Sequence, residues 1–304
     1  MGFELRILCL SCYVKSYHFM RILIVGPKSW ENQALTETAK KRGHFVLRSP
    51  LHEISLLVKN NNLEAWRHGK KLEKFDVCLV RGISPFLAKA KTLARYLDFL
   101  GVKVVDQELC DKDYEFDKMF TFFGFFQAGL PCIDTMQFST FEELSRYLIK
   151  IPEPIVIKDI CGMHSREVFS FKTKQELLKF FSTKKNTVKQ FLIQKKVDAD
   201  YYFRVLVVGG QALGAMRRMS FFHPKRKQVP LDGRSEKAEL TDELKNLAVT
   251  AAAAVNADIA GVDIIFDGKT PKLLEVNRSP KFKRFTSVMS VNVADMIIEY
   301  LDKL

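Results

Sequence analysis

Three oxygen-bearing side chains near the C-terminus have the types and the spacing of a divalent-cation site. Asp263 lies in the apolar, β-branched run 261–266, and Glu275 and Asn277 lie at the end of a second such run, 273–277. Runs of this kind are typical of β-strands, on which residues two apart leave the same face. We therefore expect Glu275 and Asn277 to point together, with Asp263 facing them across a hairpin. Two carboxylates and an amide oxygen suit Mg²⁺; the alternative is a strand whose polar residues only face solvent.

Length, hydrophobicity and charge limit the kinds of protein that the chain can be. Its 304 residues are enough for two domains, and 47% hydrophobic with 27% charged residues is ordinary for a globular protein. No apolar run approaches the roughly 20 residues that span a bilayer, so we predict no membrane association. The net charge of +13 favours acidic partners such as phosphates, polycarboxylates, acidic proteins or nucleic acid. Basic residues cluster at 224–227 and 278–284, although a solvated basic surface explains them equally well.

The N-terminal segment and the cysteines favour an intracellular protein. Residues 1–19 hold only a short apolar run, which Arg6 interrupts, so we interpret them as an extension and not as a signal peptide. The six cysteines have no repeated spacing, and no second pair completes a zinc site with Cys9 and Cys12. Reduced cysteines in this setting predict a cytoplasmic location.

Strand-type and helix-type patterns alternate from Met20 onward. Strands are predicted at 21–25, 45–47, 77–80 and 102–105, and helices at 32–42 and, capped by Ser84, at 84–99. This βαβ rhythm implies a small parallel sheet, which we assign to an N-terminal domain of residues 20–105.

A second unit starts near Asp106. Asp113 is the predicted cap of a helix at 114–128, whose phenylalanines we expect mostly in the core: Phe116, Phe120, Phe122, Phe123, Phe125 and Phe126. Further helices are predicted at 140–149, 241–256 and 291–301, and strands at 155–157, 203–208 and 212–217. Gly209 and Gly210 separate the last two strands and are typical of a hairpin turn.

The order of short motifs from Met20 to Leu304 resembles that of ATP-grasp carboxylate–amine ligases, in particular the RimK-like branch. That branch includes ribosomal-protein glutamate ligases, lysine-biosynthesis carrier ligases and relatives of glutathione synthetase. The motifs are Asp117-Lys118 with Ala128-Gly129-Leu130-Pro131, the strands 154–158 and 191–194, Arg204 to Gly210, Gly261-Val262-Asp263, and Leu274 to Pro280. Each motif is weak alone, but together, in the right order, they are specific.

The resemblance implies an α/β protein with the ATP-grasp fold and an N-terminal pre-ATP-grasp, Rossmann-like domain. Residues 106–304 would form the ATP-grasp domain, with lobes at about 106–190 and 191–304 and ATP between them. It also implies an activity, in which a carboxylate attacks the γ-phosphate of ATP and an amine then displaces phosphate to form an amide. The carboxylate would belong to a small molecule or a peptide, and the amine to an amino acid or another amine. An acidic carrier or a ribosomal protein is a candidate partner, and a homo-oligomer a candidate assembly.

The same resemblance assigns the phosphate and metal contacts of the predicted site. Asp263, Glu275 and Asn277 would hold Mg²⁺, with Mn²⁺ as a substitute, at the β- and γ-phosphates. Lys118 and Lys158 would contact the phosphates as point charges. For each lysine the alternative is a solvated surface group.

Five further residues receive roles in binding adenine and substrate. Backbone groups of Gln194, Lys195 and Lys196 would pair with the adenine edge of ATP. Arg204 and Arg218 would steady the substrate carboxylate or the acyl phosphate, because a guanidinium pairs bidentately with either. For the two arginines the alternative is a purely structural role.

Several positions depart from the family's pattern. The loop 159–167 carries one glycine where the family has a flexible glycine-rich loop over the phosphates. Lys195 and Tyr202 stand where relatives have acidic residues, and Lys281 where glycine is usual. Two alternatives therefore stay open: a catalytically impaired ATP-binding protein of the same fold, and a ribosome- or nucleic-acid-associated protein that uses the two basic clusters.

Overall fold

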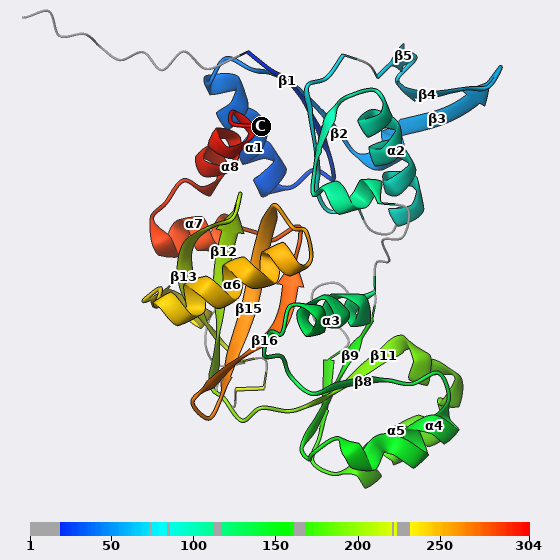
Figure 1. The fold of residues 1–304 in the computed structure, drawn as a ribbon, viewed down its shortest axis with the longest axis vertical. Helices are drawn as coiled ribbons and strands as arrows, with labels where there is room; N and C mark the ends of the chain where they lie inside the picture. Colours follow the sequence, from blue (N-terminus) through cyan, green and yellow to red (C-terminus); the bar gives the residue numbers. More distant parts are fainter. Residues whose placement is uncertain are drawn as a thin grey trace, which may run out of the picture.

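The computed structural model describes residues 19–72, 74–83, 86–111, 117–160, 168–220, 222–223 and 232–304 of the chain (Figure 1). Several predicted features lie outside the described residues: the extension at 1–18, Ser84, Asp113, Phe116, loop residues 161–167 and the basic cluster at 224–227. The N-terminal sheet lies at the top of Figure 1, a five-stranded sheet in the middle and a four-stranded sheet at the bottom.

The N-terminal domain is built on a four-stranded parallel sheet with the order β2-β1-β6-β7. Its elements are β1 (Arg21–Val25), α1 (Trp30–Lys41), β2 (Phe45–Ser49), β6 (Val77–Val80), α2 (Leu87–Phe99) and β7 (Lys103–Val105). Strand β1 is buried on both faces, with Ile22 and Ile24 in one apolar cluster and Leu23 and Val25 in another. Burial on two faces is expected of a parallel strand covered by helices on both sides, and the predicted parallel sheet is confirmed.

An antiparallel meander that the sequence analysis did not predict interrupts this domain. It consists of β3 (Ile54–Lys59), β4 (Asn62–Arg67) and β5 (Lys70–Lys71), paired in that order. Both of its turns contain two residues with positive φ, Asn60 and Asn61 in the first turn and His68 and Gly69 in the second. Positive φ at both central positions is the geometry of tight two-residue hairpins, so these asparagines and this glycine were the available signal.

The first of the two predicted lobes has its own sheet, ordered β10-β9-β11-β8, and an apolar core under α4 and α5. Its elements are α3 (Lys118–Gln127), β8 (Thr135–Gln137), α4 (Phe141–Tyr147), β9 (Ile155–Asp159), β10 (Val168–Phe171), α5 (Lys174–Ser182) and β11 (Phe191–Lys195). Ile155 and Ile157 pack on the side of α4 and α5, which leaves Lys158 and Gln194 on the opposite face. Because β11 pairs within this sheet, the structure moves the predicted lobe boundary from about 190 to a point after Lys195.

Helix α3 corrects the prediction for the phenylalanine-rich segment. It begins at Lys118 and is capped by Asp117, whose carboxylate accepts from the Met119 N–H at 2.7 Å. Phe122 and Phe125 are buried in the cluster that α6 also enters, because α3 packs through this one face. Three of its rings are 42–75% exposed: Phe120, Phe123 and Phe126. The expectation that these phenylalanines lie mostly in the core is therefore wrong.

The second lobe is a five-stranded antiparallel sheet, ordered β14-β13-β12-β15-β16, with one helix across one face. Its elements are β12 (Tyr201–Val208), β13 (Gln211–Met219), β14 (Ser235–Ala238), α6 (Asp242–Ala254), β15 (Ile259–Asp267) and β16 (Thr270–Asn277). Gly209 and Gly210 both have positive φ between β12 and β13, which confirms the predicted hairpin turn. Val205 and Val207 pack toward α6, so Arg204 and its neighbours of like parity point to the other face.

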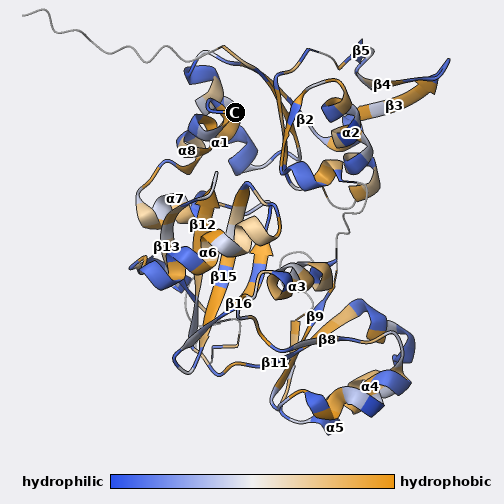
Figure 2. Ribbon diagram, viewed as in Figure 1, coloured by the Kyte–Doolittle hydropathy of each residue, from blue (hydrophilic) through white to orange (hydrophobic). Residues whose placement is uncertain are grey.

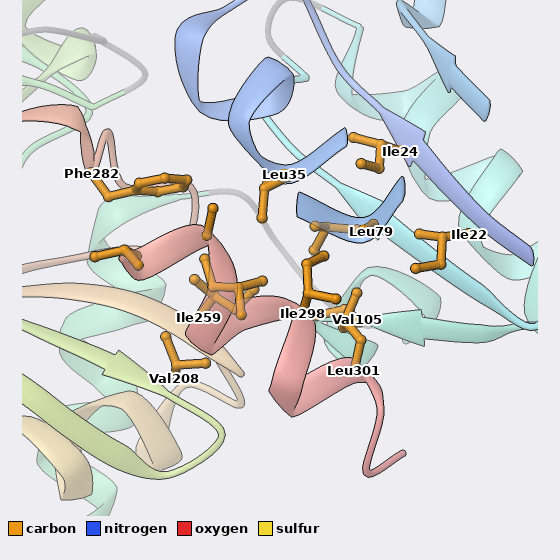
Figure 3. Close-up of a cluster of buried hydrophobic side chains, with 14 of the residues drawn as sticks. Ile22, Ile24, Leu35, Leu79, Val105, Val208, Ile259, Phe282, Ile298 and Leu301 are labelled. Carbon is orange, nitrogen blue, oxygen red and sulfur yellow. The ribbon is translucent and has the colours of Figure 1, made fainter. Parts of the chain in front are cut away.

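The C-terminal helices join the second lobe to the N-terminal domain in one core. Helix α7 (Lys283–Met289), which was not predicted, and α8 (Val293–Leu301) follow β16. Figure 3 shows Ile22 and Leu35 of the N-terminal domain together with Val208 of β12 and Ile298 of α8 in a single apolar cluster. Figure 2 shows the hydrophobic residues concentrated on the strands, whereas the helices carry residues of both kinds. None of the described helices is long and apolar enough to cross a membrane.

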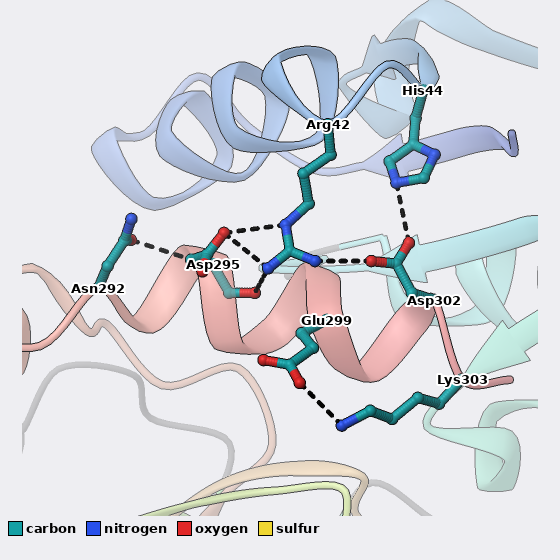
Figure 4. A network of polar contacts seen from close by, with 7 residues as sticks. All are labelled: Arg42, His44, Asn292, Asp295, Glu299, Asp302 and Lys303. Carbon is teal, nitrogen blue, oxygen red and sulfur yellow. Dashed lines mark hydrogen bonds and ion pairs between the residues drawn. The ribbon is translucent and has the colours of Figure 1, made fainter. Parts of the chain in front are cut away.

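Ion pairs between α1 and α8 lie at the edge of this shared core. Arg42, at the end of α1, donates from Nε to Asp295 (2.9 Å) in the first turn of α8 and from Nη1 to Asp302 (2.7 Å) directly after that helix (Figure 4). His44 Nε2 lies 2.9 Å from the other oxygen of Asp302. A forked guanidinium that bridges two carboxylates fixes the orientation of α8 on α1.

A buried polar contact joins the end of β7 to the second lobe. Asp106 Oδ1 accepts from the N–H groups of Asp258 (2.9 Å) and Ile259 (3.4 Å), and the Asp106 N–H donates to Asp258 Oδ2 (2.7 Å). The Tyr300 hydroxyl, on α8, donates to the other carboxylate oxygen of Asp258 at 2.8 Å. Burial raises the pKa of Asp106 to about 7; the Arg81 charge opposes this rise and the Asp258 charge adds to it.

We predict that Asp106→Asn weakens the pH dependence of stability. The folded state keeps the Asp106 proton up to about pH 7, whereas the unfolded chain releases it near pH 3.8. A raised folded pKa contributes stability that is present below pH 3.8 and is lost as the pH rises through 7. Asparagine keeps the Oδ1 acceptor without the charge. Between pH 5 and 8 the free energy of unfolding in urea should fall less in the variant, by on the order of 3 kcal/mol. Equal pH dependence in the two proteins would contradict this.

Candidate active site

The strand register brings the predicted metal residues to one face of the second lobe. Arg204 on β12 is opposite Asp263 on β15, Asp263 is opposite Glu275 on β16, and Gly261 is opposite Asn277. Residues directly opposite each other in an antiparallel pair share a face. This face is the one that α6 does not cover, so the four polar side chains share the face of the sheet opposite to α6.

Arg204 and Asp263 form a buried, bidentate ion pair. Arg204 Nε lies 2.7 Å from Asp263 Oδ1 and Nη2 lies 2.6 Å from Oδ2, and the two side chains are only 15% and 9% exposed. Burial alone would lower the pKa of Arg204, but the charge and hydrogen bonds of Asp263 outweigh it and the pKa is raised. The guanidinium fork is therefore occupied by a carboxylate of the protein. The expected contact of Arg204 with a substrate carboxylate or acyl phosphate stays a prediction, and it would use the remaining guanidinium donors.

Lys158 of the first lobe lies within electrostatic reach of these carboxylates. Burial lowers the pKa of Lys158, and so does the neighbouring Lys118 charge, whereas Glu275 and Asp263 act in the opposite direction. Lys118 Nζ donates to the Asp159 carbonyl at 2.7 Å, next to Lys158 in the chain. The two lysines thus come from the start of α3 and the end of β9 and lie near each other, and Lys158 is close enough to the carboxylates of the other lobe to feel their charge.

The segment predicted to bind adenine is tied into the protein. Gln194 Nε2 donates to Thr135 Oγ1 at 2.9 Å. The N–H groups of Lys195 and Lys196 donate to the carbonyls of Asp134 (3.1 Å) and Pro154 (2.8 Å). Because these two N–H groups are already used, the predicted adenine contacts of this backbone are restricted to its carbonyl oxygens.

Two lysines of that segment also have side-chain partners. Lys195 Nζ lies 2.8 Å from Asp267 Oδ2, which holds Lys272 as well at 3.2 Å. Asp267 ends β15, so this contact links the first lobe to the β15–β16 hairpin. Lys196 Nζ lies 5.4 Å from the centre of the Phe222 ring. Their side chains therefore hold the connection between the lobes.

Arg218 lies on the face of the sheet opposite to α6, and no carboxylate of the described residues forms an ion pair with it. It is opposite Tyr202 in the register, and its guanidinium is 5.4 Å from the centre of the Tyr202 ring. Tyr202 and Arg204 are two apart on β12, so Arg218 shares the face of Arg204 and Asp263. Stacking on an aromatic ring leaves the edge of a guanidinium able to donate.

The residues at this face fit a cation that takes oxygen ligands. Asn277 Nδ2 is buried and has no hydrogen-bond partner among the described residues. A rotated amide would present Oδ1 at that point, beside Glu275 on the same face. No group of three or more His, Cys, Asp or Glu in the described chain has a metal-binding arrangement. The set is instead two carboxylates and one amide, a composition that suits Mg²⁺ with water and phosphate as further ligands.

Residues of the N-terminal domain also reach this region, which the sequence analysis missed. Arg81 directly follows β6, and its Nη2 donates to the Pro280 carbonyl at 3.0 Å, three residues beyond Asn277. Glu108 pairs with Arg278 in the same loop. The available signal was a charged residue at the carboxyl end of a buried strand, where α/β sheets place their functional side chains.

Sequence comparisons identify relatives that span nearly the whole chain. The model of the RimK-like ATP-grasp domain matches residues 126–301. A probable alpha-L-glutamate ligase of Legionella pneumophila (strain Corby) is 24% identical over 287 residues, which cover 93% of this chain and 94% of the relative. N-acetylaspartylglutamate synthase A of Homo sapiens is 27% identical over 259 residues, covering 82% of this chain and 66% of the relative.

Solved structures of the same fold confirm the predicted ATP-grasp architecture. The ATP-grasp ligase PsnB, solved with a phosphomimetic variant of its minimal precursor, Mg and ADP, has a TM-score of 0.71 at 19% identity and covers 92% of this chain and 97% of its own. A RimK domain protein from Sphaerobacter thermophilus has a TM-score of 0.66 at 20% identity, covering 92% and 98%. At these identities the likeness concerns the fold.

We predict that Arg204→Met costs about 3–5 kcal/mol of unfolding free energy, because it leaves a buried carboxylate unpaired. The double variant Arg204→Met/Asp263→Leu removes both charges and should recover most of that loss. Urea denaturation of the three proteins measures the coupling as a double-mutant cycle. Lys303→Met, which breaks an exposed pair with Glu299, is the control and should change stability by less than about 1 kcal/mol. A double variant no more stable than Arg204→Met would refute the pairing.

Proposed function

Because the chain belongs to the RimK-like ATP-grasp family, we propose that it is an ATP-dependent ligase that joins a carboxylate to an amine. The observation that carries this proposal is that the buried Lys158 of the first lobe, next to Lys118, lies within electrostatic reach of Glu275 and Asp263 of the second lobe. Opposed cations and carboxylates are the arrangement that a metal-bound polyphosphate needs. The relatives named glutamate ligase and N-acetylaspartylglutamate synthase support the acid–amino-acid type.

The proposed reaction has two steps. A substrate carboxylate attacks the γ-phosphorus of ATP and the bond to the β-phosphate breaks, which gives an acyl phosphate and ADP. The amine then attacks the acyl carbon, phosphate leaves with its oxygen, and the amine loses a proton as the amide forms. Little covalent help from the protein is needed, since phosphoryl transfer depends on position and on neutralised charge.

The protein's own groups divide that task between the lobes. Lys118 and Lys158 would face the phosphates from the first lobe and offset their charge. Glu275 and Asn277, with Asp263, would hold Mg²⁺, which when bound supplies further charge neutralisation at the phosphates. Arg204 would hold Asp263 in its orientation, as the ion pair between them indicates.

Arg218 is the proposed contact for the substrate carboxylate. The fork of Arg204 is taken by Asp263, whereas Arg218 stacks on Tyr202 on the same face. A guanidinium pairs bidentately with a carboxylate, and the net charge of +13 would draw acidic substrates toward the site. A glutamate-containing peptide, an acidic carrier or a ribosomal protein therefore remains the preferred substrate class.

Removing a metal ligand should abolish turnover. We predict that Glu275→Gln and Asn277→Ala each lower the rate of ADP formation at least about 100-fold, because the charge of the polyphosphate is then less well offset. The rate is measured as ADP release in the presence of ATP, Mg²⁺ and a panel of acids and amines. Glu299→Gln changes an exposed carboxylate on α8, whose Oε1 lies 3.0 Å from Lys303 Nζ, and serves as the matched control. Undiminished ADP release in Glu275→Gln would sink the assignment, and wild-type ATP binding without release across the panel would favour an impaired ATP-binding protein.

A change at Arg218 should weaken binding of the carboxylate substrate without weakening binding of ATP. We predict that Arg218→Gln raises KM for the carboxylate substrate at least about tenfold, since a charge-assisted pair is lost, while KM for ATP changes little. Initial-rate kinetics with each substrate varied in turn measure the two constants. Equal increases in both KM values would show that Arg218 acts on the site as a whole.

A further inference from the structure

The loop after β16 connects the candidate metal strand to the N-terminal domain. It begins directly after Asn277 and leads into α7. Arg81, at the carboxyl end of β6, donates from Nη2 to the Pro280 carbonyl (3.0 Å) and from Nη1 to the Arg278 carbonyl (3.3 Å). Arg81 is 2% exposed, so one buried guanidinium holds two carbonyls of this loop.

The other side of this loop packs against β15, next to the candidate metal site. Gly261 is opposite Asn277 in the sheet, and a Cβ atom at Gly261 would lie 2.9 Å from Pro280 Cβ. The same Cβ would lie 3.6 Å from Cδ and Nε of Arg204, the residue that holds Asp263. Contacts below 3.0 Å do not occur between real side-chain atoms of this kind, so the loop has no room to move toward β15. The position of the loop therefore affects both Asn277 and Arg204.

A contribution to folding stability does not by itself account for the buried charge of Arg81. Burial lowers the pKa of Arg81, and the nearby carboxylates of Asp106 and Glu31 oppose that shift. A buried cation that mainly satisfies backbone carbonyls contributes little net stability compared with an apolar side chain of similar size. Its planar fork can, however, span two carbonyls that lie two residues apart, which fixes the loop in one place.

We propose that Arg81 is a positioning residue for the Mg²⁺–ATP site. It holds the loop from Arg278 to Pro280, and through that loop it sets Asn277 and Arg204 on the metal-binding face. The N-terminal domain thereby tunes a site to which it contributes no ligand. This inference rests on the proposed function, because it requires a metal–nucleotide at Asn277 and Glu275.

The effect of Mg²⁺ on ATP affinity tests the proposal. The dissociation constant for ATP is measured by calorimetry with Mg²⁺ and again with EDTA. Arg81→Met should weaken binding about tenfold with Mg²⁺, as expected for the loss of charge-assisted hydrogen bonds, and leave binding in EDTA unchanged. Arg81→Lys should recover only part of the loss, because one ammonium cannot replace the fork.

Arg42→Met is the matched control. Arg42 also fixes the N-terminal domain to a C-terminal element through a mostly buried fork, but its carboxylates lie in the first turn and at the end of α8, not in the loop 278–281. We expect it to lower the melting temperature as Arg81→Met does and to keep the full gain in affinity from Mg²⁺. Gly261→Ala approaches the loop from the other side and should reproduce the loss seen in Arg81→Met without touching the N-terminal domain.

Hydrogen–deuterium exchange on the ligand-free proteins gives a readout that does not depend on nucleotide. Amides of the loop 278–281 should exchange faster in Arg81→Met than in the wild type. In Arg42→Met their exchange rate should equal that of the wild type. Suppose that the wild type binds ATP more tightly with Mg²⁺. If Arg81→Met keeps this gain in affinity, or if Arg42→Met loses it to the same extent, the positioning role of Arg81 is wrong while the proposed function stands. If the wild type gains nothing from Mg²⁺, the proposed function fails, and the inference fails with it.

Discussion

Hydrogen bonding between β12, β15 and β16 places Arg204 opposite Asp263, and Asp263 opposite Glu275. Side chains alternate along a strand, so a slip of one residue would turn these charged groups toward α6 and its apolar cluster. Unpaired charges are costly in such surroundings, which strongly favours the native register. The ionic groups of the site thus depend on the pairing of the sheet and also help to specify it.

The two lobes are anchored in different ways. The second lobe shares one apolar core with the N-terminal domain and another with the first lobe, to which Phe122 and Phe125 of α3 contribute. The core under α4 and α5 belongs to the first lobe alone. Polar contacts also join the first lobe to the β15–β16 hairpin, namely the Lys195–Asp267 pair and the hydrogen bonds of Leu273 with Pro131 (2.9 Å) and Ile133 (3.2 Å). A nucleotide between the lobes would therefore have lysines on one side and carboxylates on the other, next to an apolar core that both lobes share.

Local patterns foretold much of this fold, and long-range contacts did not. The helices predicted from residues 140 and 241 are present, and Thr140 and Thr241 are their N-caps, because a helix start is read from a few neighbouring residues. The spacing of Glu275 and Asn277 likewise predicted a shared face. The helix predicted to begin at 114 has Asp117 as its cap, and only packing decides which of its phenylalanines are covered. The contact of Arg81 with Pro280 joins residues 199 positions apart, and the occupied fork of Arg204 depends on strand pairing, so neither can be read from spacing.

The packing of α8 on the N-terminal sheet has a consequence for synthesis of the protein. One face of that sheet, with Ile22 and Ile24, is covered by residues of α8 such as Ile298. The chain that separates these partners is long, as the 253 positions between Arg42 and Asp295 illustrate. While the ribosome is still making the intervening lobes, this apolar face lacks its cover, and exposed surface of that kind promotes aggregation of nascent chains. The N-terminal domain is thus synthesised first, but its core is complete only after α8 has been made. A chaperone that binds the nascent chain during translation would shield the apolar face until then.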